Sequence, residues 1–491
     1  MRAPRLGGLG GWLLVAVAAV GMFASTPSSA GPDEPMHEAT AWYVSSHGVP
    51  PAQGEHFLVP TSLWVSPCFG GHPETGAGCM PPRSANGGTV LAGTVYNYPP
   101  VYYLVVGFGE RIAALAGRQY ADVGGRIASA LLSFGTLFLL SLYMRRRHPL
   151  WGSFLLLLST PMAVFLGVVV NPSGWEITCG IALAAVLAEA AWTHLAGDSG
   201  PPVASDVLPR TTAILLVLAS LGLCLARPLG FVWAIGLTAS AIVLSPTVRP
   251  RLYLRIGGAV APGVAAGVLW MLTHPYKQGV MTPDGVVMPS TIRNLVDWFS
   301  QSLLRFPDRL HQMFGVLGWL DTAMPQLLVV ATIAVWAVLL TRLPSVRKTA
   351  VLIGVVGIWV LPGVVEAAGW GAWPAWWQGR YTLPFALGFV MLLVLRSGRL
   401  IPRTVSAAAA FSALSLGTMV LVNTERYAFG LTAVELPASL TNPGLGVGRL
   451  VVSLTAGAIL LLAGGYLAVQ AWMRKPDLRP RLEPDSPATP R

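Results

Sequence analysis

The sequence predicts an all-α protein that crosses a membrane about twelve times, and three observations support this prediction. Hydrophobic residues make up 54% of the 491 residues, and the mean hydropathy is +0.61. Charged residues make up only 11%, against about 25% in a soluble globular domain. The apolar residues also gather in runs of about 20, the length that crosses the hydrocarbon core of a bilayer. A soluble fold with so few charges cannot cover this much apolar surface.

Each predicted span is an apolar run between polar or glycine-rich segments. The runs are 9–29, 123–144, 150–170, 175–195, 210–226, 229–246, 254–273, 325–341, 349–366, 381–396, 404–423 and 449–472. The stretch 101–117 is apolar too, but Glu110 and Arg111 interrupt it. We therefore expect an interfacial or re-entrant helix there rather than a thirteenth span.

The basic residues predict which side each loop faces. If all twelve runs cross and the N-terminus is cytoplasmic, 20 of the 32 Lys and Arg residues lie in cytoplasmic segments. Short loops rich in Lys and Arg face the cytoplasm, so this orientation places both termini inside. We expect one transmembrane domain (1–473), with a long first outer loop (31–121) and a second outer loop (274–323). A disordered cytoplasmic tail (474–491) follows.

The N-terminus also admits a second interpretation. Arg2 and Arg5, an apolar stretch and then Ser28-Ser29-Ala30 resemble a signal peptide with a cleavage site. Cleavage would leave eleven spans and would make the first outer loop the new N-terminus. The remaining topology is the same in both interpretations.

The net charge of +11 does not indicate nucleic-acid binding. The basic residues lie in short clusters between apolar runs rather than on one face of a soluble domain. Membrane lipids are therefore the expected partner of the surface. Nucleotide-binding glycine motifs between a strand and a helix are also missing from the sequence.

The four cysteines divide into two pairs. Cys179 and Cys224 lie in predicted spans, where a thiol is usually a small apolar side chain. Cys68 and Cys79 share the first outer loop, with ten residues between them. We expect a disulfide there, because this loop faces an oxidising compartment. Two unpaired thiols are the alternative.

An acidic segment, Gly31-Pro32-Asp33-Glu34-Pro35-Met36-His37-Glu38, begins where the first span ends. Its carboxylates and the imidazole of His37 would share one face of a helix that starts near Pro35. Such a group can act as a general base or can hold a divalent cation such as Mg²⁺ or Mn²⁺, with Asp33 and Glu34 as ligands. Helix capping by the acidic residues is the alternative.

Aromatic and amide residues mark two further outer segments. Tyr96-Asn97-Tyr98-Pro99-Pro100-Val101-Tyr102-Tyr103 stands at a membrane boundary. Its tyrosines, Tyr98 and Tyr102 among them, form either an aromatic belt or the wall of a lipid or sugar groove. Asn171-Pro172 is predicted to form a tight outer turn. Either these residues are there only because they favour a turn, or Asn171 also takes part in binding.

Three arginines lie at the outer ends of spans, against the general distribution of charge. They are Arg126, Arg227 in Arg227-Pro228, and Arg380 in Gln378-Gly379-Arg380-Tyr381. A guanidinium suits a phosphate group through its forked geometry and weak hydration. Phosphate binding by these residues, with Tyr381 beside them, is therefore one hypothesis; snorkelling of span-end charges is the other.

Six motifs in this order resemble the bacterial membrane protein family called domain of unknown function 2142. They are Pro32 to His37, Tyr98 to Tyr103, Asn171-Pro172, Arg227-Pro228, Gly315 to Asp321 and Gln378 to Tyr381. The resemblance covers roughly residues 8–473. That family in turn is similar to membrane-embedded glycosyltransferases of the GT-C type, whose acidic catalytic residue follows the first span.

The resemblance implies a bacterial plasma-membrane enzyme that takes a sugar from a polyprenyl-phosphate carrier on the outer face. The acceptor would be a cell-envelope glycan or a lipid-linked molecule. Asp33 or Glu34 would be the base, and arginines would stabilise the lipid phosphate as it leaves. His37, Tyr98, Tyr102, Asn171 and Tyr381 would bind substrate. A transporter or flippase of lipid-linked glycans and a non-catalytic envelope-assembly protein are the alternatives.

Overall fold

Long apolar segments of the chain form the helices of a bundle, and polar segments join them. The computed structural model describes residues 8–82, 84, 86–93, 95–192, 207–274, 292–341, 347–367, 377–396, 402–431 and 444–473. The helices are α1 (Gly8–Ser25), α2 (Glu34–His47), α3 (Pro100–Ala114), α4 (Ala121–Met144), α5 (Trp151–Leu158), α6 (Pro161–Val168), α7 (Pro172–Trp192), α8 (Arg210–Ala226), α9 (Gly230–Val243), α10 (Pro250–Thr273), α11 (Ile292–Leu304), α12 (Phe306–Gly315), α13 (Gln326–Thr341), α14 (Arg347–Gly354), α15 (Leu361–Ala367), α16 (Leu383–Arg396), α17 (Pro402–Ala428) and α18 (Val447–Met473).

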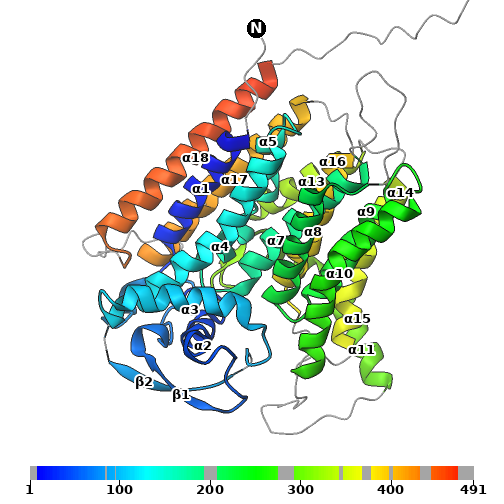
Figure 1. Cartoon of the computed structure of the whole chain (residues 1–491). Helices are drawn as coiled ribbons and strands as arrows, with labels where there is room; N and C mark the ends of the chain where they lie inside the picture. The colour runs from blue at the N-terminus through cyan, green and yellow to red at the C-terminus, as the bar shows by residue number, and fades with distance from the viewer. Residues whose placement is uncertain are drawn as a thin grey trace, which may run out of the picture.

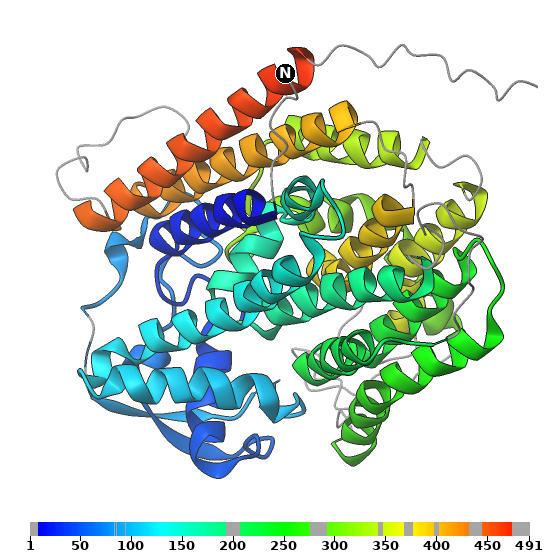
Figure 2. The same ribbon diagram turned by 45° about the horizontal axis from the view of Figure 1, so that its top comes forward.

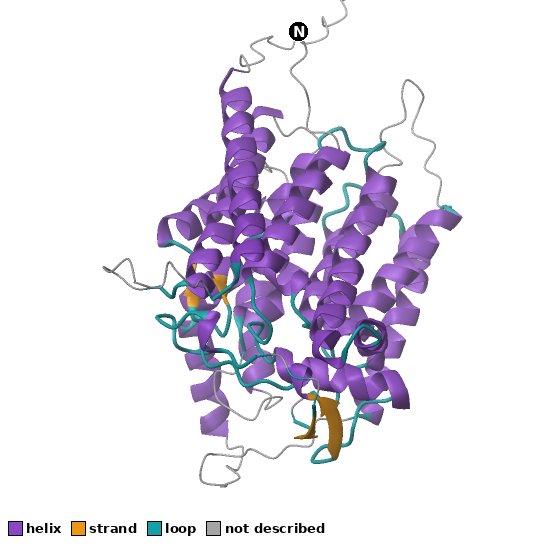
Figure 3. Cartoon of the chain, turned by 90° about the vertical axis from the view of Figure 1, so that its left-hand side faces the viewer, coloured by secondary structure: helices purple, strands orange, loops and turns teal. Residues whose placement is uncertain are grey.

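Strands are short and lie among the loops (Figure 3). Strand β1 (His56–Pro60) pairs antiparallel with β2 (Gly87–Leu91), with Leu58 opposite Thr89. Strand β3 (Val316–Leu317) pairs in the same way with β4 (Thr322–Ala323). The predicted all-α class therefore describes the bundle, and both small sheets belong to predicted outer loops.

Among the described residues, seven helices are long and apolar enough to cross a membrane, or eight if the bent pair α5 and α6 is one span. Four shorter apolar helices lie at Leu9–Ser25, Arg210–Ala226, Gly230–Val243 and Gln326–Val338. All twelve predicted runs coincide with one of these helices or with the bent pair. The chain is thus a multi-pass helical protein, and the count of twelve spans stays a prediction.

The run at 150–170 differs from the straight span that we expected. Helices α5 and α6 meet at an angle of 79°. The break falls at Ser159-Thr160, where the side chain of Thr160 accepts a hydrogen bond from the backbone N–H of Ala163 and so caps α6. Pro161 follows, and proline cannot donate the backbone hydrogen bond that would continue α5.

Two long, largely buried helices pack together in the bundle. Helices α7 and α16 pack against each other, and most of the residues in both are buried. Their backbones approach closely at Gly180, where an added Cβ would lie 2.5 Å from the carbonyl oxygen of Pro384. Helices α17 and α18 run side by side next to α1 (Figure 2).

The two described ends of the chain lie at one end of the bundle, because α1 begins and α18 ends there (Figure 1). Helices α2 and α3 and the β1–β2 pair lie at the opposite end, and α3 runs across the bundle rather than along it. The stretch 101–117 is therefore a separate helix outside the bundle. The predicted tail at 474–491 and the basic residues Arg2 and Arg5 lie outside the described residues.

Candidate functional site

Asp33 lies at the turn that joins the end of α1 to the start of α2. Its backbone takes the N-cap position of α2, yet its side chain makes no capping hydrogen bond. The backbone has φ 59° and ψ 12°, a left-handed conformation that glycine adopts freely and that, among other residues, Asn and Asp tolerate best. The carboxylate is half exposed, and its Oδ2 lies 3.3 Å from Nη2 of Arg380. The capping alternative therefore describes the backbone of Asp33 but not its side chain.

Arg380 presents a buried guanidinium to this turn. Only 2% of its surface is exposed, and its Nε and Nη1 have no hydrogen-bond partner among the described residues. The segment before it is held by Gln312, whose Oε1 accepts a hydrogen bond from the N–H of Gly379 at 2.9 Å. An added Cβ at Gly379 would lie 2.1 Å from the carbonyl oxygen of Arg309. A guanidinium whose N–H groups have no protein partner has the fork geometry that suits an anion such as phosphate.

A second guanidinium, that of Arg227, lies among the tyrosines. Its Nη2 donates to the hydroxyl of Tyr98 and its Nη1 to Oγ of Ser173, both at 2.8 Å. Its Cζ also lies 4.2 Å from the ring centre of Tyr381. The predicted residues Tyr98, Arg227 and Tyr381 thus come together from three distant segments.

His37 joins this group on the side of α2. It is buried, and its Nδ1 lies 2.8 Å from the hydroxyl of Tyr103. Burial and the nearby charges of Arg227 and Arg380 hold the pKa of His37 well below its usual value. The imidazole is therefore neutral near pH 7. We call Asp33, His37, Tyr98, Tyr103, Arg227, Arg380 and Tyr381 the open site.

Glu34 has a different environment from its neighbour Asp33. Its carboxylate is fully buried and accepts hydrogen bonds from four donors: the backbone N–H groups of Gly31 and Val170, both at 2.9 Å, and Nε and Nη2 of Arg126. Arg126 also donates to the carbonyl oxygens of Thr26 and Pro27. Glu34 and Arg126 therefore fasten the turn that carries Asp33.

Asn171 and Tyr102 also form hydrogen bonds to protein groups next to the site. The side chain of Asn171 donates to the carbonyl oxygen of Pro32 at 3.0 Å and accepts from the N–H of Ser173 at 3.0 Å. The hydroxyl of Tyr102 lies 2.9 Å from Oγ of Ser129. We call Glu34, Arg126, Asn171 and Tyr102 the support group. In the structure these four side chains bind protein groups. The sequence motifs did not distinguish the support group from the open site.

The predicted Mg²⁺ or Mn²⁺ site at Asp33 and Glu34 does not fit this geometry. Both oxygens of Glu34 already face N–H donors, and a metal ion needs free lone pairs there. Asp33 faces a cation, Arg380, at 3.3 Å. Across the described ranges, no group of three or more His, Cys, Asp or Glu side chains can hold a metal.

Two further acids are buried near the support group, and sequence reasoning did not distinguish them from exposed acids. Glu38 and Glu110 are fully buried, and within the described part of the chain neither carboxylate has a hydrogen-bond partner. Burial raises the pKa of both well above the usual value; the charge of Glu34 adds to this at Glu38, whereas Arg111 opposes it at Glu110. The sequence signals were the place of Glu38 in the acidic segment 31–38 and the interruption of an apolar stretch by Glu110.

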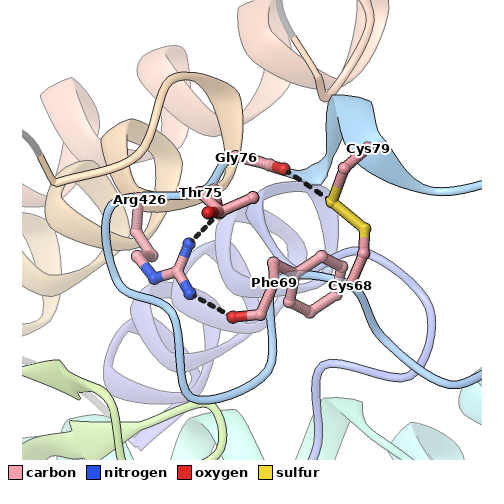
Figure 4. Close-up of a disulfide and its surroundings, with 6 residues drawn as sticks. All are labelled: Cys68, Phe69, Thr75, Gly76, Cys79 and Arg426. Atoms are coloured by element: carbon pink, nitrogen blue, oxygen red, sulfur yellow. Dashed lines mark hydrogen bonds between the residues drawn. A yellow bond between two sulfur atoms is a disulfide. The ribbon is translucent and has the colours of Figure 1, made fainter.

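The outer loop closes on a disulfide between Cys68 and Cys79, while Cys179 and Cys224 are free and buried. Figure 4 shows Arg426, at the end of α17, donating to the carbonyl oxygens of Phe69 and Thr75 inside this loop. Arg426 is a further arginine at the end of a predicted span, and sequence reasoning did not single it out. Its position after an apolar run was the available signal.

Two acids in predicted spans, Glu189 and Glu366, each have a basic partner in the structure. Glu189 lies 3.0 Å from Nε of Arg147 and 3.2 Å from His148. Glu366 pairs with Arg309 and accepts from the backbone N–H of Trp377 at 2.7 Å. Neither acid is therefore available as an isolated charge along a transport path.

Comparison with protein families yields a match over most of the chain. The family model described as "Predicted membrane protein (DUF2142)" matches residues 16–389, well over half of the chain. Neither the curated proteins nor the solved structures contain a match. The matched range includes the open site and the support group and ends within α16. This chain therefore belongs to the DUF2142 family of membrane proteins.

Proposed function

We propose that this protein is a membrane glycosyltransferase that moves a sugar from a polyprenyl-phosphate carrier to a hydroxyl acceptor. One observation carries the proposal: a half-exposed carboxylate, Asp33, stands 3.3 Å from the buried guanidinium of Arg380, two of whose nitrogens have no partner in the described ranges. Such a pair offers a base for the acceptor and a cation for a phosphate within one site. The resemblance to GT-C enzymes, with an acid just after the first span, agrees with this arrangement.

The two arginines have distinct parts in the proposal. Arg380 contacts the phosphate of the donor through its Nε and Nη1, which the described side chains leave unpartnered. Arg227 adds positive charge from a fixed position, because Tyr98 and Ser173 occupy both of its terminal nitrogens. Fixed cations of this kind stabilise the negative charge that grows on the phosphate as the sugar leaves.

In the proposed step, Asp33 takes the proton from the acceptor hydroxyl, and the acceptor oxygen forms a bond to the anomeric carbon of the sugar. The bond between that carbon and the phosphate oxygen breaks, and its electron pair stays on the polyprenyl phosphate. The sugar passes through an oxocarbenium-like state. Asp33 then loses its proton to water, since half of its side chain is exposed.

Tyrosine rings and the neutral imidazole of His37 form the apolar and hydrogen-bonding wall of the site. The rings of Tyr98 and His37 lie 5.8 Å apart, and those of Tyr98 and Tyr103 6.4 Å apart. Aromatic faces of this kind suit the C–H surfaces of a sugar ring. The acceptor in this proposal is a cell-envelope glycan or a lipid-linked molecule on the outer face of a bacterial plasma membrane, and both termini are cytoplasmic.

The test compares strains in which the gene is deleted and then restored as wild type, Asp33→Asn or Asp308→Asn. Asp308 is an exposed acid on α12 and serves as the matched control. Mass spectrometry measures lipid-linked sugars and envelope glycans at equal protein level. We expect Asp33→Asn to behave like the deletion, with one polyprenyl-phosphate sugar accumulating, and Asp308→Asn to behave like wild type. Full restoration by Asp33→Asn would contradict the proposal and favour an assembly protein or a transporter.

A further inference from the structure

The turn between α1 and α2 combines two unfavourable backbone conformations. Ser29 has φ 62° and Asp33 has φ 59°, although neither is glycine. Non-glycine residues persist in the left-handed region only where the surrounding structure holds them. The side chains that hold this turn therefore determine where the carboxylate of Asp33 stands.

Side chains from four distant parts of the chain bind the carbonyl oxygens of this turn. Arg126 and Arg449 donate to the carbonyl of Thr26. Asn171 donates to the carbonyl of Pro32. The indole Nε1 of Trp319 donates to the carbonyl of Ser29 at 3.0 Å. A side chain thus donates a hydrogen bond to the carbonyl of Ser29 itself and to that of Pro32, the residue before Asp33. Trp319 is the donor at Ser29.

Trp319 is itself fixed by its surroundings. It sits in the tight turn between β3 and β4, where Gly318 and Leu320 both have positive φ. Nearby, Asp321 accepts a hydrogen bond from the N–H of Gly71 at 3.0 Å and lies 3.2 Å from Nη2 of Arg426. Gly71 lies in the loop closed by the Cys68–Cys79 disulfide. The two carbonyl groups that Arg426 binds, those of Phe69 and Thr75, lie in the same loop (Figure 4).

We propose that Trp319 is a positioning residue for Asp33, and that the disulfide loop holds Trp319 in place through Asp321 and Arg426. The indole N–H fixes Ser29, four residues before Asp33, and so keeps the carboxylate against Arg380. The role in transfer rests on the proposed function, whereas the positional link between Trp319 and Asp33 does not.

The position of residue 33 can be followed without an activity assay, by measuring how fast a thiol placed there reacts with a maleimide. The native cysteines do not interfere, because Cys68 and Cys79 are paired and Cys179 and Cys224 are buried. Asp33→Cys in full-length protein in lipid vesicles is labelled with a membrane-impermeant maleimide, alone and together with Trp319→Phe. Phenylalanine keeps an aromatic ring but removes the N–H donor. Gln53→Cys, an exposed position in the same outer loop, is the control.

Losing one hydrogen bond should raise the labelling rate of the thiol at position 33 roughly fivefold, with the control thiol at position 53 unchanged. The thermal midpoint should move by less than about 2 °C in the Trp319→Phe variant. An unchanged labelling rate at position 33 in Trp319→Phe, or an equal rise at positions 33 and 53, would overturn the inference.

Reduction of the disulfide tests the second half of the proposal. A dithiol converts the Cys68–Cys79 bond into two protein thiols and is itself oxidised to a cyclic disulfide. After the dithiol is removed, labelling at position 33 should again be faster, with a Cys68→Ser, Cys79→Ser background as the comparison. If neither reduction nor the serine background changes the rate at position 33, the disulfide loop does not hold Trp319 in place.

Activity then separates this inference from the proposed function. If transfer depends on Asp33, Trp319→Phe with Asp33 intact should lower kcat several-fold and leave KM for the donor nearly unchanged, because only the base is displaced. If transfer does not depend on Asp33, the proposed function fails while the labelling result still stands.

Discussion

Two neighbouring acids at the start of α2, Asp33 and Glu34, have opposite surroundings. Asp33 is half exposed, stands in a left-handed conformation and has a long contact to Arg380. Glu34 is fully buried and accepts from four donors. One turn therefore both anchors the fold through Glu34 and presents a half-exposed carboxylate at Asp33, because the two consecutive side chains point to different partners.

The same division separates the open site from the support group. Polar groups in the support group are satisfied, as buried polar groups usually are. In the open site, Arg380 keeps two nitrogens that no described residue pairs, although its side chain is buried. Unsatisfied buried groups cost stability, so we expect the open site to contribute less to stability than the support group does. The variants below test that contrast.

Replacing Arg126 should have the largest effect on stability. Arg126→Met leaves the carboxylate of Glu34 buried without its cation, which should cost about 3–5 kcal/mol of unfolding free energy. Denaturant or thermal unfolding in detergent measures the loss. Arg147→Met is the control, because the pair of Arg147 with Glu189 is partly exposed and should contribute about 1 kcal/mol or less. Equal losses in the two variants would contradict the assignment of Arg126 to the support group.

Replacing Arg380 should instead affect transfer. Arg380→Gln should lower the rate of sugar transfer by roughly 10²–10³-fold, the usual effect of removing one group that stabilises a developing oxyanion. Arg380→Lys should recover only part of the rate, since a lysine lacks the planar fork. Transfer is measured with purified protein in vesicles that contain the donor lipid accumulated by the deletion strain. Arg305→Gln, an exposed arginine at the start of α12, should retain the wild-type rate.

The buried acids behind the site should make stability depend on pH. The folded state keeps the pKa of Glu38 well above 4.5, so above pH 4.5 the unfolded chain releases this proton and the folded chain retains it. Stability is therefore lost as pH rises from 4.5 toward the raised pKa, by about 1.4 kcal/mol per pH unit. Glu38→Gln cannot titrate and should lose less stability over this window. Glu74→Gln, at an exposed position, should show the wild-type dependence.

The bundle was largely predictable because its signal is local. A span is recognised from about 20 consecutive residues, and every predicted run coincides with described apolar helix. The bend at Ser159-Thr160 was not predicted, because one proline and one capping threonine interrupt an otherwise uniform apolar run. Six ordered motifs predicted that the chain belongs to the DUF2142 family, and the family match confirms this prediction.

The open site was predictable only as separate pieces. Asp33 and Arg380 are 347 residues apart in sequence, and no local pattern states that they meet. Their positions at the outer ends of apolar runs did indicate a common face. The sequence could not show that Arg126 binds Glu34 rather than substrate, because both outcomes require an arginine at a helix end. Tertiary contacts alone make that distinction.

The smallest effect tests the comparison between the two acids most directly. Asp33→Asn should change the free energy of unfolding by about 0.5 kcal/mol or less, because asparagine tolerates the left-handed conformation and the lost contact to Arg380 is long and half exposed. Glu34→Gln, one residue on, should cost several times more, since the amide N–H₂ would face Arg126 and a backbone N–H within a buried site. Both changes replace one carboxylate oxygen by an amide nitrogen. A difference in thermal stability between the two variants therefore reflects the different surroundings of residues 33 and 34. Similar losses would mean that Asp33, too, is an anchor of the fold, and Arg380 would then need another partner for its proposed chemistry.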